Sequence, residues 1–540
     1  MNINWPQILF LFTTSLLFSQ GNTDVVSQPV WVSDNGNGTY TNPILNTDYS
    51  DPDVIRVKDK FYMTASSFNC IPGLPILESN DLVNWKLIGY GLSKQIPTYV
   101  FDKVQHGKGV WAPCLRYHKN EFYIYYPDPD YGIYLIKSKT ANGPWSEPIL
   151  VKKGKGLIDP TPLWDDNGKT YLVYAFAGSR AGIKSILVVC SMNADGTSAQ
   201  NDEVLLFDGH KEEPTLEGPK IYKRNGFYYI FAPAGGVATG WQTVFRSKNI
   251  YGPYENKKVL DQGKSTVNGP HQGAWVDTKS GEDWFIHFQD KGVMGRVVHL
   301  QPMKWENDWP VMGIDTNGDG IGEPVITHKK PNVGKSFPIV YQKDSDEFNE
   351  PKLDLQWQWH ANYKTIYGFP SNSGYYMLNC IPKPKNATNL YDVPNLLLQK
   401  FPNEAFTATA KLDFNFNFDN EEGGLVIMGL DYSYLKVKQV DGKLQVSQIT
   451  CVSSDKKGLE SESEKVTLNG KQIFLQVKVS NGEDCLFSYS ENGTDFKTIG
   501  TSFKAKEGKW IGAKVGFVAL RDGFINDAGN VKIDWIRFKK

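Results

Sequence analysis

Hydrophobic and polar positions follow one repeating plan between about residues 40 and 325 of the chain. Five segments each have a polar or proline-containing start, an apolar stretch, a short charged turn and an aromatic-rich strand. The segments begin at Asp51, Trp111, Asp159, Glu217 and His271. A period of about fifty residues is typical of the blades of a β-propeller.

The turns inside these segments are typical of β-hairpins. Lys119-Asn120, Asn167-Gly168 and Asn225-Gly226 place Asn or Gly where the backbone needs a positive φ. Partial repeats at 79–85, 138–145 and 247–254 predict a second hairpin in the same units. Five units of four strands predict a five-bladed β-propeller, which we assign to residues 22–335. One long β-sandwich is the alternative, but a sandwich would not repeat on this scale.

The pattern changes near Ser345, where the fifty-residue repeat stops. Strands with alternating apolar and polar positions follow, for example at 406–416, 423–440, 472–480 and 531–538. This alternation favours a β-sandwich, which we assign to residues 336–540. Trp357 and Trp359 stand near the junction, where we expect them to pack the interface. The predicted fold class is all-β, a five-bladed β-propeller followed by a β-sandwich.

The apolar run from Trp5 to Phe18 has the length of a signal peptide and is too short to span a bilayer. We therefore assign residues 1–21 to a signal peptide and expect an exported protein, periplasmic or secreted, with no membrane anchor. A formal net charge of -1 gives no electrostatic reason to expect nucleic acid as a partner. The six cysteines show no metal-ligand spacing, and we expect buried free thiols.

Three carboxylates open three of the five repeats: Asp51, Asp159 and Glu217. Equivalent positions on innermost propeller strands converge around the axis, so we expect these side chains to share one pocket. Crowding should separate their pKa values and leave one group protonated and one ionised at neutral pH. Such a pair is what glycoside hydrolysis requires. An Asp before Pro is often only a turn residue, but three carboxylates at one repeat phase favour function.

Several ordered motifs resemble one enzyme family. They are Asn42-Pro43-Ile44-Leu45, 50–57, 60–68, Val110-Trp111-Ala112-Pro113, Gly156-Leu157-Ile158-Asp159, Leu216-Glu217-Gly218-Pro219, 295–305 and Trp309-Pro310. On these motifs the chain resembles glycoside hydrolase family 43, and residues 346–359 resemble the start of the sandwich that one branch of that family carries.

The resemblance implies an inverting hydrolase on a five-bladed propeller. In it, Asp51 corresponds to the general base, Glu217 to the general acid, and Asp159 to the carboxylate that tunes the acid and orients the sugar. Inversion predicts a separation of about 6.5–9.5 Å between the two catalytic carboxyls, which leaves room for a water molecule. The resemblance implies no required cofactor.

The resemblance also implies five substrate-binding residues around the sugar, namely Phe68, Ile71, Trp111, His271 and Arg296. Phe68 and Ile71 lie in the stretch Phe-Asn-Cys-Ile-Pro, where the family commonly has Trp, so we expect an altered pocket wall. Trp111 could stack on a sugar or belong to the core. His271 stands where the family often has a histidine near a central ion or water, and a hydrogen-bonding role is the commoner one.

Residues Asp315 to Glu323 resemble the first half of a calcium loop, with oxygen-bearing side chains at positions 1, 3 and 5 and Gly at position 6. The twelfth position is Ile326, so the bidentate Glu is absent. A structural calcium ion and a polar interdomain turn are the two interpretations, and we favour the turn. The identity of any bound metal is left open.

We predict an exo-acting glycosidase whose partner is an oligosaccharide or polysaccharide. The predicted activity is an α-L-arabinofuranosidase that removes terminal residues from hemicellulose side chains, of arabinoxylan or xyloglucan. The second choice is a β-D-xylosidase, or an enzyme with both activities. A non-catalytic carbohydrate-binding propeller and a retaining hydrolase of fructosides are the rival hypotheses.

Overall fold

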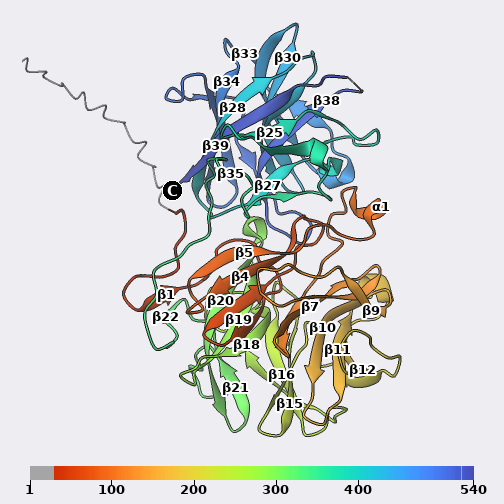
Figure 1. The fold of residues 1–540 in the computed structure, drawn as a ribbon. Helices are drawn as coiled ribbons and strands as arrows, with labels where there is room; N and C mark the ends of the chain where they lie inside the picture. Colours follow the sequence, from red (N-terminus) through yellow and green to blue (C-terminus); the bar gives the residue numbers. More distant parts are fainter. Residues whose placement is uncertain (1–28, 525) are drawn as a thin grey trace, which may run out of the picture.

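The computed structural model describes residues 29–524 and 526–540, in two β-rich bodies joined side by side (Figure 1). The signal peptide that we assign to residues 1–21 lies outside the described residues. None of the described helices has both the length and the apolarity that a membrane span requires.

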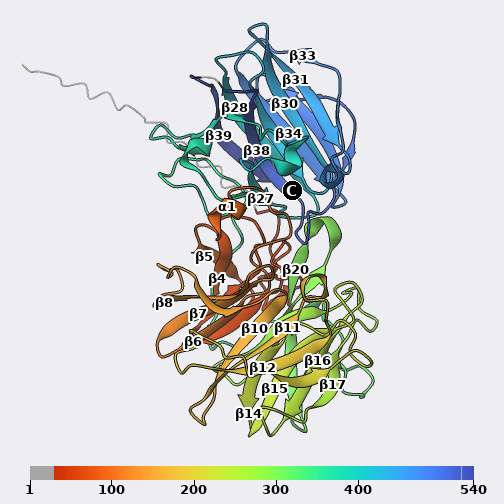
Figure 2. The same cartoon turned by 90° about the vertical axis from the view of Figure 1, so that its right-hand side faces the viewer.

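The first body is a propeller of five antiparallel four-stranded sheets, each built from consecutive strands (Figures 1 and 2). The blades are β2 (Asp53–Val57), β3 (Lys60–Thr64), β4 (Gly73–Ser79) and β5 (Trp85–Leu92); β6 (Cys114–His118), β7 (Glu121–Asp128), β8 (Gly132–Ser138) and β9 (Ile149–Lys153); β10 (Leu157–Trp164), β11 (Thr170–Phe176), β12 (Ile186–Met192) and β13 (Val204–Asp208); β14 (Lys220–Arg224), β15 (Phe227–Ala234), β16 (Trp241–Ser247) and β17 (Glu255–Leu260); β18 (His271–Asp277), β19 (Asp283–Asp290), β20 (Arg296–Glu306) and β21 (Trp309–Met312).

The two ends of the propeller sequence are tied together. β1 (Thr39–Thr41) pairs with β22 (Thr327–Lys329), and Leu45 forms an antiparallel bridge with Val298 of the fifth blade. Short helices α1 (Thr98–Phe101), α2 (Gly178–Ala181) and η1 (Gly292–Met294) stand in loops. The prediction of a five-bladed propeller is confirmed.

The predicted hairpin turns are also present. Lys119 and Asn120 connect β6 to β7 with φ values of 47° and 62°, and Asn225 and Gly226 connect β14 to β15 with 50° and 78°. Asn and Gly adopt this left-handed region with little strain, which explains why these residues occupy the turns.

The second body is a sandwich of two sheets (Figure 2). One sheet contains β23 (Gln358–Trp359), β27 (Leu397–Lys400), β38 (Lys514–Arg521), β29 (Glu422–Met428), β30 (Tyr432–Val440), β31 (Lys443–Cys451) and β32 (Glu460–Glu462), with β26 (Ile381–Pro382) and β33 (Val466–Thr467) beside them. The other contains β24 (Gly368–Pro370), β25 (Tyr376–Asn379), β39 (Asn530–Lys539), β28 (Phe406–Asn415), β34 (Gln472–Ser480), β35 (Asp484–Ser490) and β36 (Lys497–Thr498), with β37 (Phe503–Lys504). The connections include η2 (Thr365–Tyr367), η3 (Leu390–Asp392) and η4 (Ser454–Lys456).

The alternation read from the sequence appears directly in the sandwich. Every second residue of β28 is buried, and these residues face the core between the sheets. All six cysteines are buried free thiols, as predicted. Trp357 and Trp359 are also buried, and the indole nitrogen of Trp357 donates a hydrogen bond to Asp346 Oδ2 at 2.7 Å.

The sandwich contacts the propeller at the first blade and beside β20. Trp359 of β23 exchanges two backbone hydrogen bonds with Ile71, of 3.1 and 2.6 Å. The Ala513 N–H donates to the carbonyl of Val293 at 2.8 Å, directly before β20. The sandwich therefore contacts two segments that lead to the propeller axis.

Candidate active site

The starts of the five repeats lie on the innermost strands of the blades. Asp51 and Glu217 closely precede β2 and β14, Asp159 belongs to β10, and His271 opens β18. The innermost strands contact one another around the ring, β18 with β2, β2 with β6, β6 with β10 and β10 with β14. Residues far apart in the sequence are therefore brought to one end of the propeller axis, as the repeat phase predicted.

Irregular backbone conformations set the direction of the Asp51 and Asp159 side chains. Asp51 and Asp159 both have a φ of 55°, a left-handed conformation that is strained for residues other than Gly, Asn or Asp. The register of β10 shifts between Ile158 and Thr161, so Asp159 sits in a β-bulge. A bulge turns a side chain out of the ordinary alternation of a strand. The irregular backbone positions therefore coincide with two of the candidate catalytic residues.

Asp51 is held as a hydrogen-bond acceptor. Arg296 Nη1 lies 3.1 Å from Asp51 Oδ1 and 2.7 Å from the hydroxyl oxygen of Ser50. The hydroxyl of Ser66 donates to Asp51 Oδ2 at 2.5 Å. The ion pair and the hydroxyl donor fix the orientation of the Asp51 side chain. This setting suits a base.

Asp159 lies between the third, fourth and fifth blades. Its Oδ2 accepts the backbone N–H of Gly218 at 2.7 Å, and its Oδ1 accepts from Gln272 Nε2 at 3.4 Å. Gln272 itself sits at a second bulge, where the register of β18 shifts between His271 and Gly273. Burial, opposed by the Gly218 hydrogen bond and reinforced by Asp51, raises the pKa of Asp159 to about 6.

Glu217 has a strongly raised pKa. Burial raises its pKa to about 8, and the negative charges of Asp159 and Asp51 contribute in the same direction. Its side chain is 27% exposed, so it faces open space at the mouth of the site. At neutral pH the group is mostly protonated, which suits an acid that gives its proton to a leaving oxygen.

His271 packs against Glu217, with 3.6 Å between Nε2 and Oε1. Burial, together with the charge of Arg296 and His287, lowers the pKa of His271 to about 3. The imidazole is therefore neutral, and the contact is not an ion pair. Within the described part of the chain neither ring nitrogen has a hydrogen-bond partner.

Phe68 and Trp111, two of the predicted substrate-binding residues, contact each other. Their rings meet edge to face with centroids 6.4 Å apart, and the Phe68 backbone pairs with Val110. Trp111 donates its indole N–H to the Gly107 carbonyl at 2.9 Å, while the Arg180 guanidinium lies 5.4 Å from its ring centroid. Ile71 is buried and pairs with Trp359 of the sandwich through its backbone.

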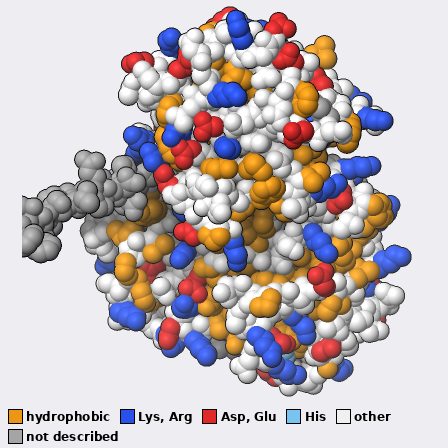
Figure 3. All heavy atoms as spheres, turned by 45° about the horizontal axis from the view of Figure 1, so that its top comes forward, with side chains coloured by type: hydrophobic (Ala, Val, Ile, Leu, Met, Phe, Trp, Pro, Cys, Tyr) orange, Lys and Arg blue, Asp and Glu red, His pale blue; other side chains and the backbone are white. Residues whose placement is uncertain are grey.

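Trp510 comes to the site from the sandwich. It lies in the loop before β38, is 44% exposed, and its ring centroid is 5.8 Å from the guanidinium of Arg296. The same loop packs beside Gly107, the residue whose carbonyl holds Trp111. Apolar side chains gather between the upper and lower bodies on the face shown in Figure 3.

Sequence reasoning missed Ser66, Gln272 and Trp510. Gln272 directly follows His271 and could have been found from the repeat phase if a bulge had been expected there. Ser66 lies fifteen positions from Asp51 along the chain, inside the motif 60–68, but the repeat phase does not single out a serine there. Trp510 belongs to another domain, and no sequence pattern connects it with the propeller axis.

In the loop from Asp315 to Glu323, backbone N–H groups of the loop itself donate hydrogen bonds to the first carboxylate. Asp315 accepts backbone N–H groups of Gly318 at 2.7 Å and Gly320 at 2.9 Å. Among the described residues, no group of three or more His, Cys, Asp or Glu side chains is arranged to hold a metal ion.

Comparisons with known proteins agree with this geometry. The family model described as Glycosyl hydrolases family 43 matches residues 40–310, and the model described as Beta xylosidase C-terminal Concanavalin A-like domain matches residues 345–539. The chain is 39% identical to a protein of Xylanibacter ruminicola named "Putative beta-xylosidase", over 89% of this chain and 86% of that protein. It is 32% identical to a "Beta-xylosidase" of Formosa agariphila, over 94% and 91%.

Two further comparisons are more distant in sequence. A "Non-reducing end alpha-L-arabinofuranosidase" of Bacteroides ovatus is 28% identical, over 93% of this chain and 95% of that protein. The crystal structure of the GH43 BlXynB protein from Bacillus licheniformis superimposes with a TM-score of 0.80 at 25% identity, over 93% of this chain and 99% of that one.

Proposed function

The chain belongs to glycoside hydrolase family 43, and from this premise we propose that it is an inverting exo-β-D-xylosidase. The observation that carries the chemistry is the pairing of a protonated Glu217 with an Asp51 held by Arg296. As a family member the chain is a glycosidase acting on oligosaccharides or polysaccharides. The sugar, the stereochemistry and the residue roles are our proposal.

In the proposed reaction Glu217 gives its proton to the glycosidic oxygen while the bond from that oxygen to the anomeric carbon breaks. Asp51 takes a proton from a water molecule that attacks the anomeric carbon from the opposite face. Asp159 stays unreacted. Its charge supports the high pKa of Glu217, and its hydrogen bond to Gly218 N–H fixes the backbone next to that acid.

The order of the two sugars differs from the prediction made from the sequence. That prediction placed arabinofuranoside first, on the altered wall around Ile71 and on the long sandwich. Part of that wall, Ile71, pairs with the sandwich through its backbone, and the relatives of 39% and 32% identity carry β-xylosidase names. An α-L-arabinofuranosidase is the second candidate, supported by the relative from Bacteroides ovatus.

The test is hydrolysis of 4-nitrophenyl β-D-xyloside, 4-nitrophenyl α-L-arabinofuranoside and xylobiose by the wild type, Asp51→Asn and Glu217→Gln. We expect the xyloside to react faster, and both variants to lose about 10²–10⁴-fold on xylobiose. Glu217→Gln should lose less on the aryl xyloside, because nitrophenolate leaves without a proton. Asp128→Asn, which changes another buried carboxyl, is the control. Intact turnover in either catalytic variant would refute the assignment.

The first-formed anomer separates inversion from the retaining mechanism of the fructoside-hydrolase hypothesis. Proton NMR during xylobiose hydrolysis should show α-xylose first. Activity on neither pentoside would favour a binding propeller over an enzyme of this specificity. We further propose export after cleavage behind Gly21 and hydrolysis without a cofactor. N-terminal sequencing of the exported protein and assays after dialysis against a chelator test these two points.

A further inference from the structure

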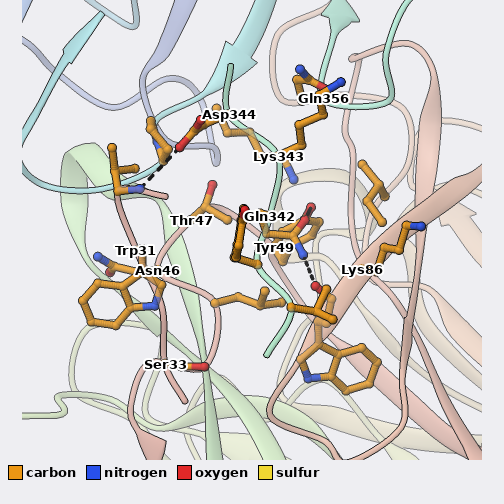
Figure 4. Close-up of a pocket in the computed structure, with 18 of the residues that line it drawn as sticks. Trp31, Ser33, Asn46, Thr47, Tyr49, Lys86, Gln342, Lys343, Asp344 and Gln356 are labelled. Atoms are coloured by element: carbon orange, nitrogen blue, oxygen red, sulfur yellow. Dashed lines mark hydrogen bonds between the residues drawn. The ribbon is translucent and has the colours of Figure 1, made fainter. Parts of the chain in front are cut away.

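A second cavity lies apart from the candidate active site, where the first blade, the interdomain linker and the sandwich meet (Figure 4). Its volume is about 440 Å³, within the range of about 300–1,000 Å³ that small-molecule sites occupy. Residues of five segments surround it, at 30–33, 44–49, 83–90, 340–344 and 399–402, with Asp354, Leu355 and Gln356. None of Asp51, Asp159 and Glu217 lines it.

Lys400 is the unusual residue of this cavity. Its side chain lies over the ring of Tyr49, with 3.5 Å from Nζ to the ring centroid, and both residues line the cavity. Among the described residues no hydrogen bond and no ion pair of its ammonium is found. Burial lowers its pKa to about 8; the negative charge of Asp48 opposes this decrease and the nearby Lys514 adds to it, so the ammonium still carries its charge at neutral pH. A shielded ammonium without a partner is unfavourable unless an anion reaches it.

The other two lysines that line the cavity are either already paired or exposed to solvent. Lys343 already forms an ion pair with Asp354, and Lys86 is exposed at the rim. The carboxylate of Asp344 accepts hydrogen bonds from the Val30 N–H and the Ser345 hydroxyl. Among the described lysines that line the cavity, Lys400 is therefore the one that is shielded and has neither an ion pair nor a hydrogen bond, and it is the group that an anion in the cavity would meet.

The walls offer the features that sugars use. Trp31 and Tyr49 contribute aromatic rings, and Gln342 spans the floor between the Tyr49 hydroxyl, at 3.1 Å, and the Trp85 carbonyl, at 2.6 Å (Figure 4). Rings of this kind pack against the apolar faces of pyranoses, while ring hydroxyls need hydrogen-bond partners.

Two buried polar atoms of the wall also lack partners. Asn46 donates its amide N–H to Asn403 Oδ1 at 2.9 Å, and Asn403 donates to the Val30 carbonyl at 2.9 Å. These two hydrogen bonds fix the orientation of both side-chain amides, so Asn46 Oδ1 is the amide atom that still needs a hydrogen-bond donor. Asn46 Oδ1 and Trp31 Nε1 have no partner in the described structure. A hydroxyl group can accept from the indole N–H or donate to the amide oxygen, and a buried polar group left without a partner is unfavourable.

We propose that this cavity is a second carbohydrate site that binds a uronic-acid-bearing oligosaccharide, with its carboxylate on Lys400 and a pyranose ring against Trp31. The choice of a sugar rests on the proposed function, whereas the demand for an anion rests on Lys400 alone. Such a site would hold decorated hemicellulose chains near the enzyme while the catalytic pocket removes terminal residues.

The test measures binding by calorimetry in the Glu217→Gln background, where substrate is not turned over. The ligands are xylotriose, xylotriose carrying a glucuronic acid branch, and free glucuronate. Excess xylobiose occupies the catalytic pocket. The branched ligand should still bind to one site per chain, and Lys400→Met should weaken that binding at least tenfold. Trp31→Phe, which keeps a ring and removes the N–H, should weaken it less.

Lys438→Met is the matched control, because Lys438 is a half-buried lysine of β30 outside the cavity. It should bind the branched ligand as the parent does. Lys400→Met removes a shielded charge without a partner, so its melting temperature should not fall, and its hydrolysis of aryl xyloside should be unchanged. A normal melting curve would exclude misfolding as the cause of lost binding.

Three outcomes would overturn the proposal. The branched ligand could be fully displaced by xylobiose, which would place it in the catalytic pocket. Xylotriose could bind the second site as tightly as the branched ligand, which would remove the role of the carboxylate. Glucuronate or acetate could match the branched ligand, which would make the cavity a general carboxylate site. Because the readout is binding, absent xylosidase activity in the wild type would refute the proposed function and leave this test intact.

Discussion

Replacement of Asp159 by Asn should move the alkaline limit of activity to lower pH. The pKa of Glu217 is raised from 4.5 to about 8, by burial first and by the charge of Asp159 second. Asn keeps the shape of Asp159 and can still accept the Gly218 N–H, but it removes the charge. Glu217 would then lose its proton more easily, and the protonated acid would disappear at a lower pH.

The size of the change follows from the causes of the high pKa. A neighbouring charge at close range shifts a pKa by about 1–3 units. Because burial of Glu217 is the larger cause and remains in the variant, we expect the lower part of this range. The alkaline limb of kcat/KM should fall from about pH 8 by about 1–1.5 pH units, equivalent to about 1.4–2 kcal/mol.

The assay is the pH dependence of kcat/KM for xylobiose, whose leaving group needs a proton. The limb of kcat/KM reports ionisation in the free enzyme. Asp128→Asn is the control, because Asp128 is a buried carboxyl whose pKa burial raises to about 7, yet it is not among the groups that act on Glu217. An Asp159→Asn limb that stays in place, or moves to higher pH, would refute the electrostatic argument, whatever happens to the maximal rate.

Three further predictions concern neighbouring groups. Arg296→Lys should lower kcat/KM about 10–100-fold, because a lysine cannot reproduce the guanidinium that reaches Ser50 and Asp51 together. An unchanged kcat/KM in steady-state kinetics would contradict this prediction. Trp510→Ala should raise KM for xylotriose, because the exposed Trp510 ring lies 5.8 Å from the Arg296 guanidinium at the site; an unchanged KM would contradict a contact between Trp510 and the substrate. Glu217→Gln should raise the melting temperature, and by more at pH 9 than at pH 5. The pKa of Glu217 is about 8 in the folded protein and 4.5 without the fold, so its ionisation costs stability as the pH rises above 4.5. The whole cost is present above about pH 8, and Gln removes it. Calorimetry showing the same gain at both pH values would count against the raised pKa.

The repeat phase made the propeller and its three carboxylates predictable. Each blade buries the same positions, so Asp51, Asp159 and Glu217 could be placed at one end of the axis from their spacing alone. The pattern could not locate the bulges that aim Asp159 and Gln272, because a bulge is one residue of irregular pairing with no compositional signal here. It also could not rank xyloside against arabinofuranoside, since that choice depends on the pocket walls.

The stretch Phe-Asn-Cys-Ile-Pro at 68–72 contacts both the propeller and the sandwich, so motifs of the propeller alone do not describe its surroundings. In the stretch Phe-Asn-Cys-Ile-Pro, Phe68 packs against Trp111 at the site, Cys70 accepts a hydrogen bond from Lys514 Nζ at 3.0 Å, and Ile71 pairs with Trp359. Lys514 and Trp359 belong to the sandwich. The departure of this stretch from the family pattern is therefore matched by residues of the second domain. We therefore expect a change at Cys70 or Lys514 to disturb the position of Phe68, because this stretch is held by residues of the sandwich.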